Sequence, residues 1–134
     1  MSVAVTINSV VNLDPSGGLD NTQNELIVDG ALTLSGNYGN LSPANGDTID
    51  FTGFDLIKSQ QPPRKVDIFQ LPDAGIAPVP YTFLYGQGDG QDDGVLIVIH
   101  TTTGLPITDA AAYPAALTAA GANIRFRAWF PSFI

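Results

Sequence analysis

The 134-residue chain contains no cysteine, and this absence excludes several kinds of protein at once. Without cysteine there is no disulfide framework, no thiolate metal site and no cysteine nucleophile. Long hydrophobic runs are also missing, since no stretch approaches the roughly 20 residues that a membrane-spanning helix needs. The apolar opening of the chain has no basic segment before it and alternates with Thr, Asn and Ser, which predicts a strand and not a signal peptide.

Basic residues are scarce. Five Lys and Arg stand against 13 Asp and Glu, which leaves a formal net charge of −8. The first fifty residues carry acids but no Lys or Arg at all. An acidic surface repels the phosphates of nucleic acids and the anionic surface of membranes, so we expect neither as a partner.

The residue types that carry catalysis are few and poorly placed. His100 is the only histidine and ends the most apolar run of the chain, and no Gly-x-Ser-x-Gly nucleophile elbow occurs. Nearly all acids fall in turn positions, where Asp is favoured because it bonds to its own backbone. No Gly-x-Gly-x-x-Gly stands at a strand-to-helix junction. We therefore expect a protein that is not an enzyme and that has no cofactor and no metal.

One acidic loop, residues 86–94, leaves an alternative open. Asp89, Asp92 and Asp93 offer the carboxylate oxygens that calcium takes, between glycines that let a chain wrap an ion. The spacing departs from the helix-loop-helix calcium pattern, because His100 stands where that pattern has its bidentate Glu. A solvated hairpin tip is the favoured interpretation, with a bound cation as the alternative.

Short apolar runs separated by turn residues dominate the chain, which contains 14 Gly and 10 Pro. This organisation predicts an all-β fold, a single-domain β-sandwich or jelly-roll-like structure over residues 1–134. A hairpin is expected over 81–100; its returning run, 95–99, is apolar on both faces, which predicts a central strand covered on both sides. At most one short helix is expected near 115–120, with Thr108 or Asp109 as N-cap and Gly121 as C-cap. Further strands are expected at 3–11, 25–28 (closed by Asp29-Gly30), 31–34, 48–54, 65–71 and 124–130.

The last predicted strand separates two kinds of side chain. Ile124, Phe126, Ala128 and Phe130 share one face, and Arg125, Arg127 and Trp129 share the other. Trp and Arg are enriched at binding hot spots. The alternative is a closing strand whose aromatic residues only fill the core. The predicted partner or oligomer contacts are Arg125, Arg127, Trp129, Phe130, Phe133 and Ile134.

Six short motifs follow one another along the chain: LTLSGNY (32–38), GDTIDF (46–51), PPRKV (62–66), YTFLYG (81–86), AAYPAALTA (111–119) and IRFRAWFP (124–131). In these motifs, from residue 32 onward, the chain resembles the small structural proteins of tailed bacteriophages, several of which are head decoration, or cement, proteins. The resemblance implies a β-sandwich or jelly-roll-like virion protein, often a homotrimer. Such a protein is made in the host cytoplasm and then clamps neighbouring subunits of the major capsid protein from the capsid exterior.

A carbohydrate-binding β-sandwich of a phage tail or adhesin is the alternative function. Tyr38, Tyr81, Tyr85 and Trp129 would be its stacking platforms. A sugar-binding site needs such aromatic residues to be exposed among polar groups, so burial of these rings would count against it.

Overall fold

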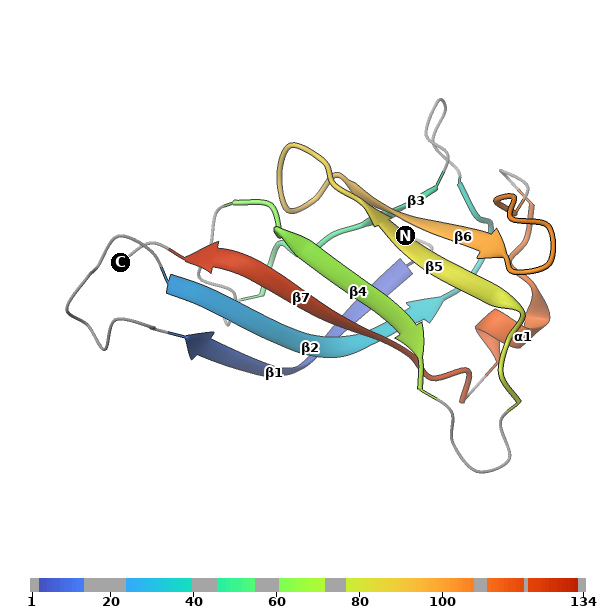
Figure 1. The fold of residues 1–134 in the computed structure, drawn as a ribbon, viewed down its shortest axis with the longest axis horizontal. Coiled ribbons are helices and arrows are strands. Elements are labelled where there is room, and N and C mark those ends of the chain that lie inside the picture. The colour runs from blue at the N-terminus through green and yellow to red at the C-terminus, as the bar shows by residue number, and fades with distance from the viewer. Residues whose placement is uncertain are drawn as a thin grey trace.

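The computed structural model describes residues 3–13, 24–39, 46–54, 61–71, 77–107, 111–119 and 121–132. These residues form two antiparallel sheets packed face to face, so the predicted all-β sandwich is confirmed (Figure 1). One sheet has four strands in the order β1-β2-β7-β4, and the other has three in the order β3-β6-β5. The strands are β1 (Val3–Leu13), β2 (Asn24–Leu34), β3 (Asp47–Ile49), β4 (Lys65–Gln70), β5 (Tyr81–Gly86), β6 (Gly94–His100) and β7 (Ile124–Ser132).

The four-stranded sheet follows the period of two that the sequence predicts for its strands. In β7 the even-numbered residues from Ile124 to Phe130 are buried, and Arg125, Arg127 and Trp129 point to the opposite face. In β4, Ile68 is buried while Phe69 is exposed. A register shift between Ile7 and Ser9 of β1 moves the inward positions from odd to even numbers, which lets Val10 pack against the core.

The turn predicted at Asp29-Gly30 is wrong, because β2 runs straight through both residues. Gly30 pairs with Ile7 on one side and Phe126 on the other. A Cβ atom on Gly30 would lie 2.0 Å from the Thr6 carbonyl oxygen and 2.7 Å from the Phe126 ring. Gly30 is therefore the place where an aromatic ring lies across the backbone, not a strand end.

The three-stranded sheet contains the predicted hairpin, β5 and β6, with β6 central. Its third strand is shorter than the predicted 48–54, because the Asp50 carboxylate accepts a hydrogen bond of 2.8 Å from the Thr52 N–H and turns the chain after Ile49. Both Ile49 and Phe51 still face the core.

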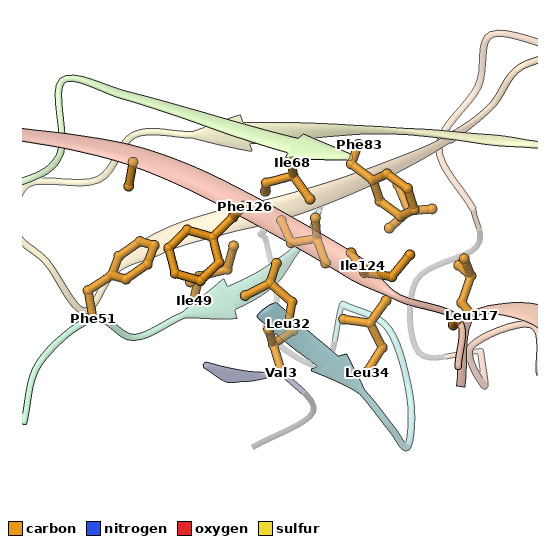
Figure 2. Packing of buried hydrophobic residues seen from close by; sticks show 14 of the residues in the cluster. Val3, Leu32, Leu34, Ile49, Phe51, Ile68, Phe83, Leu117, Ile124 and Phe126 are labelled. Atoms are coloured by element: carbon orange, nitrogen blue, oxygen red, sulfur yellow. The ribbon is translucent and has the colours of Figure 1, made fainter. Parts of the chain in front are cut away.

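Aromatic rings join the two layers. The Phe51 ring centroid lies 5.5 Å from that of Phe126 and 5.4 Å from that of Phe130, so the three-stranded sheet rests on the inner face of β7 (Figure 2). These rings belong to a continuous cluster of buried side chains from both sheets. Burial of such a cluster is the main stabilising contribution to the sandwich.

The single described helix, α1 (Ala115–Thr118), closes one end of the sandwich by burying Leu117 (Figure 1). Its place agrees with the prediction, but its ends do not. Pro114 is the N-cap and Ala119 the C-cap, while Gly121 lies beyond the helix. Residues 108–110, where the predicted N-caps fall, lie outside the described residues.

Candidate binding surface

The outer face of the four-stranded sheet brings together three of the predicted contact residues. Strand pairing places the outward side chains in rows across β2, β7 and β4. One row contains Ile27, Trp129 and Lys65, and the next contains Asp29, Arg127 and Asp67. Because β7 is an inner strand held on both sides, these side chains stand on a rigid backbone.

Arg127 and Asp29 form the best-defined ion pair of this face. Arg127 Nε donates to Asp29 Oδ1 over 2.6 Å, and Nη2 donates to Oδ2 over 3.0 Å. These hydrogen bonds lower the pKa of Asp29 and raise the pKa of Arg127 from their ordinary values. Both side chains keep contact with solvent, so the pair orients the guanidinium more than it stabilises the fold.

Trp129 and Arg125 are each held by one neighbour. Lys65 Nζ lies 5.1 Å from the centroid of the Trp129 ring, within the range of a cation–π interaction. Arg125 Nε donates to Asn123 Oδ1 over 2.8 Å. Phe69, exposed on β4, pairs with Arg125 across the strands. The face thus combines an indole, two guanidinium groups and apolar residues, the composition typical of protein–protein contacts.

Phe130 does not belong to this surface, which corrects its predicted role as a contact. Its side chain has no exposed area and fills the core against Phe51. The alternation of β7 turns Phe130 to the side opposite Trp129. Phe133 and Ile134, the other two predicted contacts, lie outside the described residues.

The outer face of the three-stranded sheet has a different character, which the sequence did not reveal. The strand register turns Thr48 of β3, Thr82 and Leu84 of β5, and Val95, Ile97 and Ile99 of β6 outward. None of these side chains is charged. The signal was the apolar run 95–99, which was predicted to be covered on both sides. Core residues cover only its inner side, and the outer Val95, Ile97 and Ile99 are half-buried.

A buried polar cluster joins residues from three of the quoted motifs. Tyr113 donates from its hydroxyl to Asp47 Oδ2 over 2.7 Å, and the Tyr38 ring meets the Tyr113 ring edge-on at 5.6 Å. Backbone hydrogen bonds from Tyr38 to Ala111 and from Tyr113 to Gly36 hold the two segments together. Burial and the bond to Asp47 raise the pKa of Tyr113 above its ordinary value. The cluster is closed to solvent and therefore structural.

The acidic loop 86–94 bonds to itself. Asp93 accepts the N–H groups of Asp89 and Gly90 over 2.9 and 2.8 Å, and these bonds lower the pKa of Asp93. Asp89 and Asp92 are exposed at the tip. Among the described residues, no group of three acidic or histidine side chains is placed to hold a metal ion. The arrangement is that of a hairpin tip in which a carboxylate caps a turn.

The candidate sugar-stacking rings do not form one platform. Tyr38 is fully buried, and the Tyr85 hydroxyl is buried without a hydrogen-bond partner. The half-buried Tyr81 ring lies 5.0 Å from the His100 ring, at the far end of β6 from the acidic loop. Trp129 belongs to the other sheet.

A groove of about 590 Å³ runs between the edge strands β4 and β5, lined among others by Val66, Phe83 and Tyr85. Glutamine side chains bridge it near both ends: Gln87 Nε2 donates to the Pro63 carbonyl over 3.2 Å, and Gln70 Oε1 accepts the Val79 N–H over 2.9 Å. These bonds tie the two sheets together along this side and protect the strand edges.

The chain matches no protein-family model, and no curated protein or solved structure matches it. Within the described residues, no helix has the length and hydropathy required to cross a membrane. The fold defines the class of the protein, a two-sheet antiparallel β-sandwich with two unlike outer faces.

Proposed function

We propose that the chain is a non-enzymatic virion structural protein of a tailed bacteriophage, a decoration protein that binds the outside of the head. In this role it is made in the host cytoplasm, joins the capsid exterior, works as a homo-oligomer (a trimer, from the resemblance) and stabilises contacts between subunits of the major capsid protein. The observation that carries the proposal is the gathering of Arg125, Arg127 and Trp129 on one face of an inner strand.

The chemistry of this face suits a protein partner. Trp129 is half-buried and offers the uncovered part of its indole, over which Lys65 lies, as an apolar contact. Arg127 is oriented by Asp29 before any partner arrives. A preorganised face of this kind loses less conformational entropy on docking than flexible loops would.

Stabilisation of a capsid needs many copies and not high affinity of each one. A copy that bridges two capsid subunits opposes their separation, and copies joined to one another bind with a raised effective concentration.

The proposal is tested by co-sedimentation with heads assembled without this chain from the major capsid protein of the same genome. We expect saturable binding of the purified chain and a higher temperature of head disruption. Trp129→Ala should weaken binding by about tenfold or more. The control, Thr118→Ala, alters an exposed residue of α1 that lies outside both outer sheet faces, and this variant should bind as the unaltered chain does.

Thermal unfolding of each variant separates lost binding from lost folding. A chain that remains in the supernatant at saturating concentration contradicts the proposal. So does a Trp129→Ala variant that folds normally and binds heads with unchanged affinity.

A further inference from the structure

The side chains on the outer face of the three-stranded sheet are uncharged. Its middle consists of Leu84, 48% exposed, beside Ile97, with Val95 and Ile99 on either side along β6. The surface continues past the end of β6, where Pro106 pairs with Ile99 and is exposed next to Leu105. The seven described strands all belong to the two sheets of the sandwich, and α1 contacts β2 of the other sheet, so no described strand or helix lies over this face.

Two glycines let the outer side chains of β6 lie close to the neighbouring strands. A Cβ atom on Gly86 would lie 2.8 Å from Val95 Cγ2, and one on Gly46 would lie 3.1 Å from Val95 Cβ and 3.3 Å from Ile97 Cγ1. The side chains of Val95 and Ile97 therefore spread over the glycines on both sides. The resulting surface has β-branched side chains held close to the sheet, which limits the entropy lost on contact.

The charge of the chain decides which surface two copies can share. With a net charge of −8, copies repel one another wherever acidic side chains would meet. A contact through the other sheet would also remove water from Asp29, Asp67 and the cations beside them, at a cost that burial of charge imposes. The uncharged face avoids both penalties.

We infer that the outer face of the three-stranded sheet is the contact between copies of this chain. A second copy would cover Val95, Ile97 and Ile99, whose side chains are apolar and only half-buried. A face that meets its own copy closes a dimer about a two-fold axis, whereas a trimer would use this face as one half of a heterologous contact. Both arrangements bury Leu84. The inference does not depend on what the opposite sheet binds.

The test is the solution mass of the full chain, measured by light scattering after size exclusion over a wide range of concentration. We expect a mass that rises with concentration to a multiple of 14.1 kDa. Leu84→Glu should reduce the mass to that of the monomer at concentrations where the unaltered chain is associated. The matched control is Val11→Glu, since Val11 is 49% exposed on the opposite sheet, and this variant should associate as the unaltered chain does.

Added salt gives a second, independent reading. Because the contact itself contains no charge, screening of the net negative charge should strengthen association. Thermal unfolding of both Glu variants is the control for folding. We expect both to unfold cooperatively, because the substituted positions are half-exposed.

Three results would overturn the inference. The first is an unaltered chain that stays monomeric at every concentration. The second is a folded Leu84→Glu variant that associates normally, including the case in which it has lost head binding and the face belongs to the capsid. The third is an association that weakens as salt is added.

Discussion

The two sheets of this sandwich distribute polarity in opposite ways. The four-stranded sheet presents Arg127, Asp29 and Lys65 to solvent and buries only apolar side chains between its described strands. The three-stranded sheet has an uncharged outer face and buries the carboxylate of Asp47 on its inner side, with Gln91 buried in the loop between β5 and β6. The inner face of the three-stranded sheet contacts the other sheet, and its uncharged outer face is suited to contact with a partner.

The contrast teaches that the two outer faces are suited to different partners. Charged and aromatic groups oriented in advance give specificity for a foreign surface. An uncharged face gives little specificity for one partner over another. It does allow acidic copies of the chain to associate without bringing their charges together. The following predictions test this difference, beginning with the largest effect.

Glycines of the two sheets should respond very differently to an added methyl group. Gly30→Ala places Cβ against the Thr6 carbonyl and the Phe126 ring inside the four-stranded sheet, and should lower the free energy of unfolding by about 3 kcal/mol or more. Gly86→Ala brings Cβ within 2.8 Å of Val95 Cγ2 and forces that side chain to shift, but no backbone atom stands in the way, so the cost should be smaller, about 1–2 kcal/mol. Urea unfolding measures both, and equal costs would show that the outer face is packed as tightly as the core.

Two tyrosine hydroxyls buried at the inner side of the three-stranded sheet form the next pair. Tyr113→Phe removes the donor to the buried Asp47 carboxylate and should destabilise the fold by about 1–3 kcal/mol. Tyr85→Phe removes a buried hydroxyl that has no partner, and should be neutral or stabilise by up to about 1 kcal/mol. If Tyr85→Phe were the more damaging change, the assignment of polar roles inside this sheet would be contradicted.

Alkaline pH should weaken the same sheet. Burial, with a smaller contribution from Asp93, raises the pKa of Tyr85 from 10.0 to about 12. Above pH 10 the unfolded chain therefore loses a proton that the folded chain retains, so stability falls as the pH rises from about 10 to 12. The pKa of Tyr113 is also raised, so part of the loss occurs in both proteins. Allowing for solvent around the Tyr85 ring, we expect unfolding measured across this pH range to show a loss about 1 kcal/mol larger in the unaltered chain than in Tyr85→Phe. A loss of the same size in both proteins would assign the effect to other groups.

The ion pair on the charged face should contribute least to stability. Since Arg127 lowers the pKa of Asp29, the contribution is present above the ordinary carboxyl pKa of 3.8 and is lost as the pH falls through the lower folded value. Asp29→Asn should cost under about 1 kcal/mol at neutral pH and nothing in strong acid. Thermal unfolding at both pH values measures this. A difference that persisted in acid would show that Asp29 acts through packing and not through its charge.

The sequence predicts those parts of the sandwich that alternate along one strand. The sides of β7 and β4 follow from the pattern of apolar residues at every second position. The hairpin follows from the glycine-rich loop between two apolar runs, and the short helix from the capping residues expected around it. Gly30 was misread because the close approach of Phe126 involves a residue 96 positions away (126 minus 30). The hydrogen bond between Tyr113 and Asp47 is likewise nonlocal.

The candidate surface was predictable only where it depends on alternation along a single strand. Alternation placed Arg125, Arg127 and Trp129 on one side, although it did not supply Asp29 and Lys65, which only strand pairing brings beside them. Phe130 is an aromatic residue in the same segment, but its even-numbered position turns it into the core. The uncharged outer face could not be predicted, because the sequence of an apolar strand does not indicate whether other residues cover one or both of its sides.

Because the chain lacks cysteine, one introduced thiol reports the exposure of one chosen position. The most direct test of the two-face account compares the labelling rates of Val11→Cys and Leu84→Cys, whose parent side chains are 49% and 48% exposed on opposite sheets. We predict that the thiol at position 84 becomes protected when the free chain is concentrated, and that the thiol at position 11 becomes protected only on heads. Labelling of both thiols at their dilute rates in the concentrated and head-bound states would contradict the account.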